Sequence, residues 1–277
     1  MLTTSLDGLW VLQVLTGIEV LAPEMGLRPH LPSVEPKHKA LAHPVTVELR
    51  AAGAIDETDS VDGAIVEWLT VLSRRDVGLM IHFRLAENGE PARAMLARFA
   101  QWWVAIERSG DLVRIGGVGI SSSEGAASSV INAQIERLCG ASDPAPLRPV
   151  TLDADAMRAA ATDLKALHEF LGKQGLDADQ VHMLKLANDP DRSAQASIIA
   201  IQSGVDNGQP TRTHIDHGAV TIIDTPEGRL VAEHVPSAGK KWMIVAPGTK
   251  TNIGSAINQM VRRLPADQEW FSYRKVV

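Results

Sequence analysis

The chain has 277 residues, which fits one large domain or two small ones, and 45% of them are hydrophobic, enough for a sizeable core. Its formal net charge of −6 argues against a nucleic-acid-binding protein, which usually needs a basic face to neutralise phosphates. Because Cys139 is the single cysteine, an internal disulfide and a cysteine-based zinc site are excluded, and a reducing compartment is favoured.

The N-terminal residues predict a short strand followed by a helix. The strand covers 3–6, and Asp7 is the expected N-cap of a helix that ends at Gly17. The apolar stretch 9–21 is interrupted by polar residues, is too short to span a bilayer, and lacks the basic flank of a signal peptide. We therefore expect a cytoplasmic protein without membrane insertion.

The remainder of the first half mixes helical and extended patterns. Periodicity, turns and caps predict a helical stretch at 36–52 broken at Pro44, a helix at 62–73, strands at 77–85, within 95–106 and at 112–115, and a helix at 124–138. Ser121 and Glu124 form a capping-box pattern before the last helix, and Asn88-Gly89 is a tight-turn signal. Adjacent Trp102 and Trp103 must point to opposite strand faces, so we expect one of them to be exposed or at an interface.

A proline-rich segment separates two halves of the chain. Pro144, Pro146 and Pro149 fall within it, and prolines at this density neither continue a helix nor pair inside a sheet. We therefore divide the chain into an N-terminal α+β half at 1–139, a connector at 140–151 and a C-terminal α+β half at 152–277. The halves are expected to form one compact domain over 1–277.

The second half repeats the order of the first. Its predicted elements are a helix at 153–171, a helix opening at Asp177 with Gln180 in a capping box and ending at Asn188, a strand at 193–202, a turn at Asn207-Gly208, a hairpin of 219–224 and 229–235, a strand at 242–246, and a helix at 251–264. The segment 129–138 aligns with 255–264, with Ser, Ile, Asn, Arg and Leu shared. This repeat predicts two similar α+β units about a pseudo-two-fold axis.

Two short motifs could carry chemistry. His214, Asp216 and His217 offer zinc-type ligands, but strand alternation turns residue 217 away from the other two, which favours polar residues at a strand end. The run Gly116–Gly119 resembles a phosphate cradle but lacks the lysine of a P-loop, so a flexible loop before a helix cap is favoured. Cys139 is interpreted as a small buried apolar group. We expect no catalytic group, no metal and no cofactor.

Several segments in order along the chain resemble a known family. They are Asp7-Gly-Leu-Trp10, Pro146-Leu-Arg-Pro-Val150, Gly218-Ala-Val-Thr-Ile-Ile-Asp-Thr-Pro-Glu-Gly-Arg-Leu230, Ala246-Pro-Gly-Thr249 and Arg262-Arg-Leu-Pro265. The set resembles the EspG family, the secretion-associated proteins of mycobacterial type VII (ESX) systems, and is nearest to the paralogue of the second ESX locus. The resemblance covers nearly the whole chain.

The resemblance implies a cytosolic chaperone that binds the helical tip of the PPE protein in a PE–PPE heterodimer before export. It implies a central, mainly antiparallel sheet flanked by helical bundles, with the partner on the sheet, the C-terminal bundle and the loop at 86–91. The free chain would be a monomer or a weak homodimer. The residues predicted to contact the partner are Glu87, Asn88 and Gly89 of the loop, and Gln195, Ser197 and Ile199 of one strand face.

Two other functions remain open from the residues. One is a metal-dependent enzyme that uses His214, Asp216 and His217, which metal analysis of the purified protein would test. The other is a homo-oligomeric structural component, which would associate with itself and have no affinity for a PE–PPE pair. The absence of a convergent catalytic motif favours the chaperone.

Overall fold

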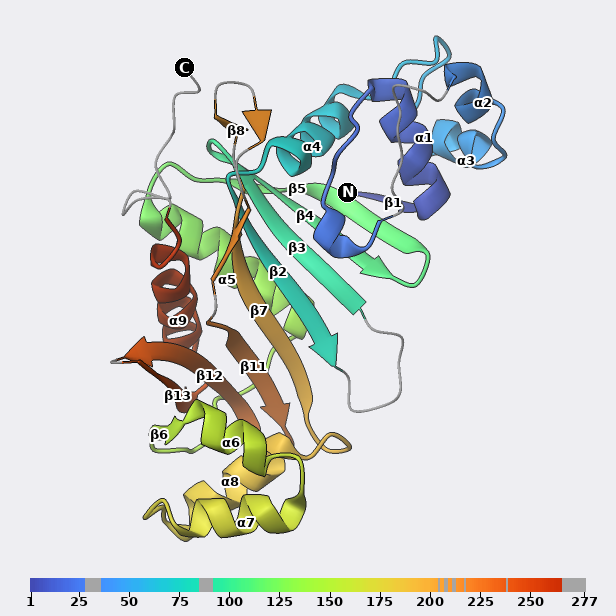
Figure 1. Ribbon diagram of the computed structural model, residues 1–277. Helices are drawn as coiled ribbons and strands as arrows, with labels where there is room; N and C mark the ends of the chain where they lie inside the picture. Colours follow the sequence, from blue (N-terminus) through green and yellow to red (C-terminus); the bar gives the residue numbers. More distant parts are fainter. Residues whose placement is uncertain are drawn as a thin grey trace.

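In the part of the chain that the structure describes, eleven strands form one large sheet, with neighbouring strands antiparallel (Figure 1). In spatial order they are β1 (Leu2–Ser5), β5 (Leu112–Ile120), β4 (Trp102–Ser109), β3 (Ala92–Phe99), β2 (Val77–Arg84), β7 (Ala194–Gln202), β11 (Val220–Thr225), β12 (Gly228–Ser237), β13 (Lys240–Pro247) and β6 (Val150–Asp153), and β10 (His214–Ile215) adds to β7. β8 (Val205–Asp206) and β9 (Gln209–Pro210) pair separately. The computed structural model describes residues 1–27, 36–84, 92–203, 205–206, 209–210, 213–216, 218–237 and 239–265.

The strand order repeats outward from the centre of the sheet. β2 and β7 form the junction, paired from Val77 opposite Gln202 to Arg84 opposite Gln195. From there the first half continues β3, β4, β5, β1, and the second continues β11, β12, β13, β6. In each half the outermost strand is therefore the first in the chain. This mirrored order confirms the predicted pseudo-two-fold fold, while the boundaries 1–139, 140–151 and 152–277 stay a prediction.

Helices α5 (Glu124–Cys139) and α9 (Lys250–Arg262) cover one side of the sheet and touch each other across the pseudo-axis. Asn258 donates to the Ser128 hydroxyl at 2.9 Å. The equivalent pair in the aligned repeats is Asn132 and Gly254, and a Cβ added at Gly254 would lie 3.1 Å from Asn132. The alignment seen in the sequence thus corresponds to a symmetric helix contact.

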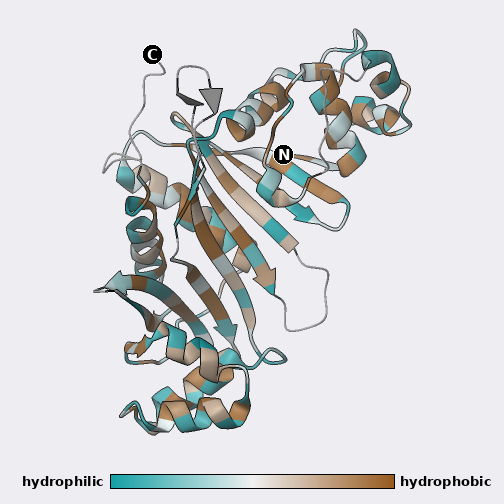
Figure 2. Cartoon of the chain, viewed as in Figure 1, coloured by the Kyte–Doolittle hydropathy of each residue, from teal (hydrophilic) through white to brown (hydrophobic). Residues whose placement is uncertain are grey.

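Two helical bundles cover opposite ends of the other side of the sheet (Figure 1). The N-terminal bundle comprises α1 (Leu6–Thr16), η1 (Pro23–Met25), α2 (Lys37–Leu41), α3 (Val45–Ala51) and α4 (Gly63–Arg74). The C-terminal bundle comprises α6 (Ala154–Ala160), α7 (Leu164–Gly172) and α8 (Ala178–Asn188). Figure 2 shows hydrophobic residues along the strands and a mixture of hydrophobic and hydrophilic residues on the helices. Each bundle has its own buried apolar cluster, so the middle of this side lies between two separate cores.

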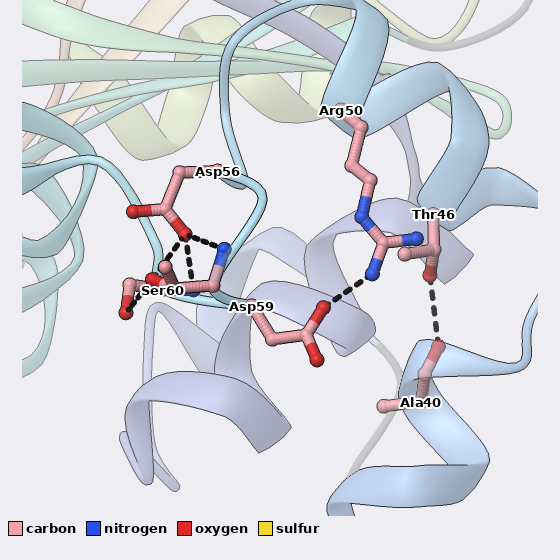
Figure 3. Close-up of polar contacts among 7 residues, drawn as sticks. Ala40, Thr46, Arg50, Asp56, Asp59 and Ser60 are labelled. Atoms are coloured by element: carbon pink, nitrogen blue, oxygen red, sulfur yellow. Dashed lines mark hydrogen bonds and ion pairs between the residues drawn. The ribbon is translucent and has the colours of Figure 1, made fainter.

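Polar contacts order the loop between α3 and α4 in the N-terminal bundle (Figure 3). Asp56 accepts hydrogen bonds from the backbone nitrogens of Thr58 at 2.8 Å and Ser60 at 2.9 Å, and the bond from Ser60 is the main reason that the pKa of Asp56 is lowered. Arg50 pairs with Asp59 across the same loop. These bonds satisfy backbone donors that a loop otherwise leaves to water.

Most predicted elements are confirmed within a few residues, but in two regions the prediction joined separate elements into one. The pattern at 95–106 is two strands, β3 and β4, joined at Ala100, whose φ of 55° is unusual for alanine and gave no turn signal. The single helix predicted at 153–171 is β6, α6 and α7. Its apolar spacing runs through the break, and Asp163 caps α7 by accepting from the Ala166 nitrogen at 3.0 Å.

Three local predictions were wrong, two because a neighbouring serine is the helix cap and one because a predicted loop is part of a strand. Ser5, not Asp7, caps α1, and Ser123, not Ser121, caps α5. Gly116–Gly119 lies within β5, not in a loop. A Cβ at Gly117 would lie 3.0 Å from the Trp68 indole nitrogen, and one at Gly119 would lie 2.7 Å from Val130. The glycines therefore let side chains from α4 and α5 approach the strand.

Candidate partner-binding face

The part of the sheet between the two bundles is accessible. We call it the open face, and define it by His82, Arg84, Arg93, Gln195, Ser197 and Thr221. His82 and Arg84 are exposed and the other four are half-buried. On β2, β3, β7 and β11 these residues alternate with buried residues that pack against α5 and α9. The face thus arises because each strand must turn alternate side chains away from that core.

The predicted contact residues on β7 share this face. Ile199 packs against the core of the N-terminal bundle, and Gln195 donates to the Ala187 carbonyl of α8 at 3.2 Å. Ser197 lies between them, with its hydroxyl 3.3 Å from that of Thr221. The row therefore links both bundles across the sheet. Its role in binding a partner stays a prediction, and Glu87, Asn88 and Gly89 lie outside the described residues.

Basic side chains occupy the β2–β3 part of the open face. Arg93 lies opposite His82 in the strand register, and Arg108 lies opposite Arg93. Burial, and then the charge of Arg93, lower the pKa of His82, which favours the neutral imidazole. Arg108 donates to the carbonyls of Met25 at 3.0 Å and Gly110 at 2.9 Å, so its guanidinium holds the turn after η1.

In the structure, Asp216 of the possible metal motif is engaged by an arginine. Asp216 accepts from Arg263 Nη2 at 2.9 Å and from Arg263 Nε at 3.1 Å. His214 is exposed, and His217 is outside the part of the chain that the structure describes. Among the described residues, no three His, Cys, Asp or Glu side chains are grouped to hold a metal. Burial raises the pKa of Cys139 to about 11, so its thiol is protonated at neutral pH.

Sequence reasoning missed two features of the surface. One is the exposure of residues 82 and 84, because the pattern at 77–85 predicts a strand but does not show which of its side chains the bundles leave uncovered. The second feature is a cavity of about 470 Å³ beside α4, lined by Trp68, Phe99, Trp102 and Ile120 among others. Trp102 is 45% exposed there and Trp103 is 1% exposed, which confirms the expectation for this pair.

The described helices include none that is long and apolar enough to cross a bilayer. The family model described as "EspG family" matches residues 5–259. The chain is 47% identical over 277 residues to the ESX-2 secretion-associated protein EspG2 of Mycobacterium tuberculosis, with all of both chains covered. It is 24% identical to the ESX-5 secretion-associated protein EspG5 of Mycobacterium marinum, over 99% of this chain and 97% of the relative.

A solved structure shares the fold over almost the full length. It is the type VII secretion system chaperone EspG5 of M. tuberculosis in complex with a PE25–PPE41 dimer. The TM-score is 0.76 at 22% sequence identity, with 99% of each chain covered. At this identity the similarity supports the fold, and it agrees with the large antiparallel sheet described above.

Proposed function

The chain belongs to the EspG family, and we propose that it is a non-enzymatic, cytoplasmic chaperone of a type VII (ESX) secretion system. It binds the helical tip of the PPE protein in a cognate PE–PPE heterodimer, keeps that protein soluble and delivers it for export. Masking an apolar tip prevents aggregation, because exposed apolar patches otherwise associate without specificity.

The observation that carries this proposal is the open face between the two bundles. It combines half-buried polar side chains with the bundles as walls on either side, which suits shape recognition of a protein surface. Gln195, Ser197 and Ile199 would contact the tip, together with Glu87, Asn88 and Gly89 of the β2–β3 connection. Specificity would then depend on shape and charge across this face.

Co-expression with PE–PPE pairs from the same genome tests the proposal. Size-exclusion chromatography with light scattering should give a mass equal to one copy of each of the three chains. The free chain should elute as a monomer or a weak homodimer. The proposal fails if every pair elutes apart from this chain, or if a PE–PPE pair that co-elutes with it is equally soluble without it.

A matched pair of variants tests the position of the interface. Ser197→Arg places a large side chain in the middle of the open face, so complex formation should be lost. Ser255→Arg makes the same change at an exposed position of α9, on the other side of the sheet, and should bind normally. Equal binding by both variants would place the interface elsewhere.

A further inference from the structure

On the side of the large sheet that carries the two bundles and the open face, the charged side chains of the strands all have the same sign. The ionisable side chains on that side, which lie an even number of residues along their strands from residues packed against the bundles, are these: His82, Arg84, Arg93, Arg108, His234 and Lys241. Within the described strands of the large sheet, no aspartate or glutamate shares that side, although the chain as a whole carries −6. The strand carboxylates, such as Glu107, Asp224 and Glu233, alternate onto the α5–α9 side.

Three of these basic residues are neighbours on the open face. Arg93 is directly opposite His82. Arg84 is two residues further along β2, so its backbone lies about 7 Å from that of His82 at the usual strand rise. On its other side Arg93 lies opposite Arg108, and like charges placed opposite each other in a sheet are destabilising. Among the described residues no carboxylate pairs with Arg84 or Arg93, whereas Arg108 is engaged by backbone carbonyls. Arg84 is exposed and Arg93 is half-buried, and a ligand carboxylate would supply the counter-charge that the described residues do not give them.

We propose that Arg84 and Arg93 form a seat for an acidic side chain at the helical tip of the PPE partner. This inference rests on the proposed function and names the chemistry of the partner at the same face. A guanidinium binds a carboxylate through two parallel hydrogen bonds, which fixes orientation as well as affinity. A tip without a carboxylate would leave two cations desolvated and unpaired, so the seat would discriminate among PPE proteins.

The test uses the full-length chain and a PE–PPE pair that co-elutes with it. Arg84→Gln/Arg93→Gln should weaken the affinity at least about tenfold and reduce its dependence on salt, because a charge-assisted contact is lost. Lys250→Gln removes a charge from α9 on the opposite side, where Lys250 pairs with Glu136 on the surface, and should change the affinity less than about twofold. The melting temperature of the double variant should equal or exceed that of the wild type.

A second arm changes the partner. Replacing the acidic residues of the PPE tip by their amides, one at a time, should identify one that weakens binding to the wild type and has no further effect on the double variant. Wild-type affinity in the double variant would overturn the arginine seat while leaving the chaperone function intact. If the wild-type chain forms no complex with any pair, the proposed function fails and this inference fails with it.

Discussion

Replacing Arg229 tests how the connector is attached to the second half. Its side chain is only 5% exposed. It donates to the two carboxylate oxygens of Asp224, at 2.6 Å from Nε and 2.8 Å from Nη2. It also donates to the carbonyls of Gly140 at 3.1 Å and Cys139 at 2.9 Å, at the end of α5. One guanidinium thus binds a strand neighbour and the C-terminus of a helix from the other half.

Arg229→Met keeps most of the apolar stem and removes all four hydrogen bonds. Bonds to charged groups contribute about 1.5–3 kcal/mol each, but Asp224 is partly exposed and recovers water in the variant. We therefore expect a loss of about 3 kcal/mol in the free energy of unfolding. For a chain of this size that corresponds to a melting temperature lower by about 6–12 °C.

Thermal unfolding followed by circular dichroism measures this effect. Arg229→Lys keeps the charge but has no planar fork, so its loss should be intermediate. Arg262→Met is the matched control, because it removes a solvent-exposed ion pair with Glu124 and should cost at most about 1 kcal/mol. A loss in Arg229→Met no larger than that of the control would refute the attachment role of Arg229.

Three further predictions concern single residues. Glu233→Gln should stabilise the protein at neutral pH and lose this advantage on acidification, because burial raises the pKa of Glu233 and one of its buried carboxylate oxygens has no hydrogen-bond partner. Urea unfolding of the variant and the wild type over a range of pH measures this, and a difference in stability that does not change with pH would contradict it. Cys139 should react slowly with a thiol reagent at pH 8 in the native protein and rapidly in urea, because burial raises its pKa to about 11; rapid native labelling would contradict this. Gly119→Ala should destabilise the protein by about 1–3 kcal/mol, because the added Cβ would lie 2.7 Å from Val130. Gly125→Ala is the control, because Gly125 lies in a helix with open space around it and the change should not destabilise. Equal denaturant midpoints for the two variants would contradict the prediction.

Local chemistry in the sequence predicted many elements of the fold. Asp177 and Gln180 form the capping box that their spacing indicates, and Gly17 ends α1 in a left-handed conformation. The repeat of 129–138 in 255–264 predicted the pseudo-two-fold relation, because equivalent residues meet where α5 and α9 touch. These features depend on contacts within a few residues or on a direct comparison of two segments.

The remaining features depend on contacts between residues far apart in the chain. The pairing of β2 with β7 joins the halves, but either strand could have paired with any strand of similar hydrophobicity. Arg229 looks like an ordinary hairpin residue until the end of α5 is placed beside it. To predict the open face, one must know which parts of the sheet the bundles cover, whereas periodicity shows only that β7 has two faces.

The two sides of the sheet are subject to different physical constraints. On the α5–α9 side, residues such as Ile198 and Val220 are completely buried, so a change of volume or charge there destabilises the fold. On the open face, Arg84 and Ser197 are not in a core, so their charge and size can change with little loss of packing. A protein of this fold can therefore change its partner at the open face while keeping the helix-packed side. Because β2 and β7 both contribute to that face, a partner bound there contacts both halves of the chain at their junction.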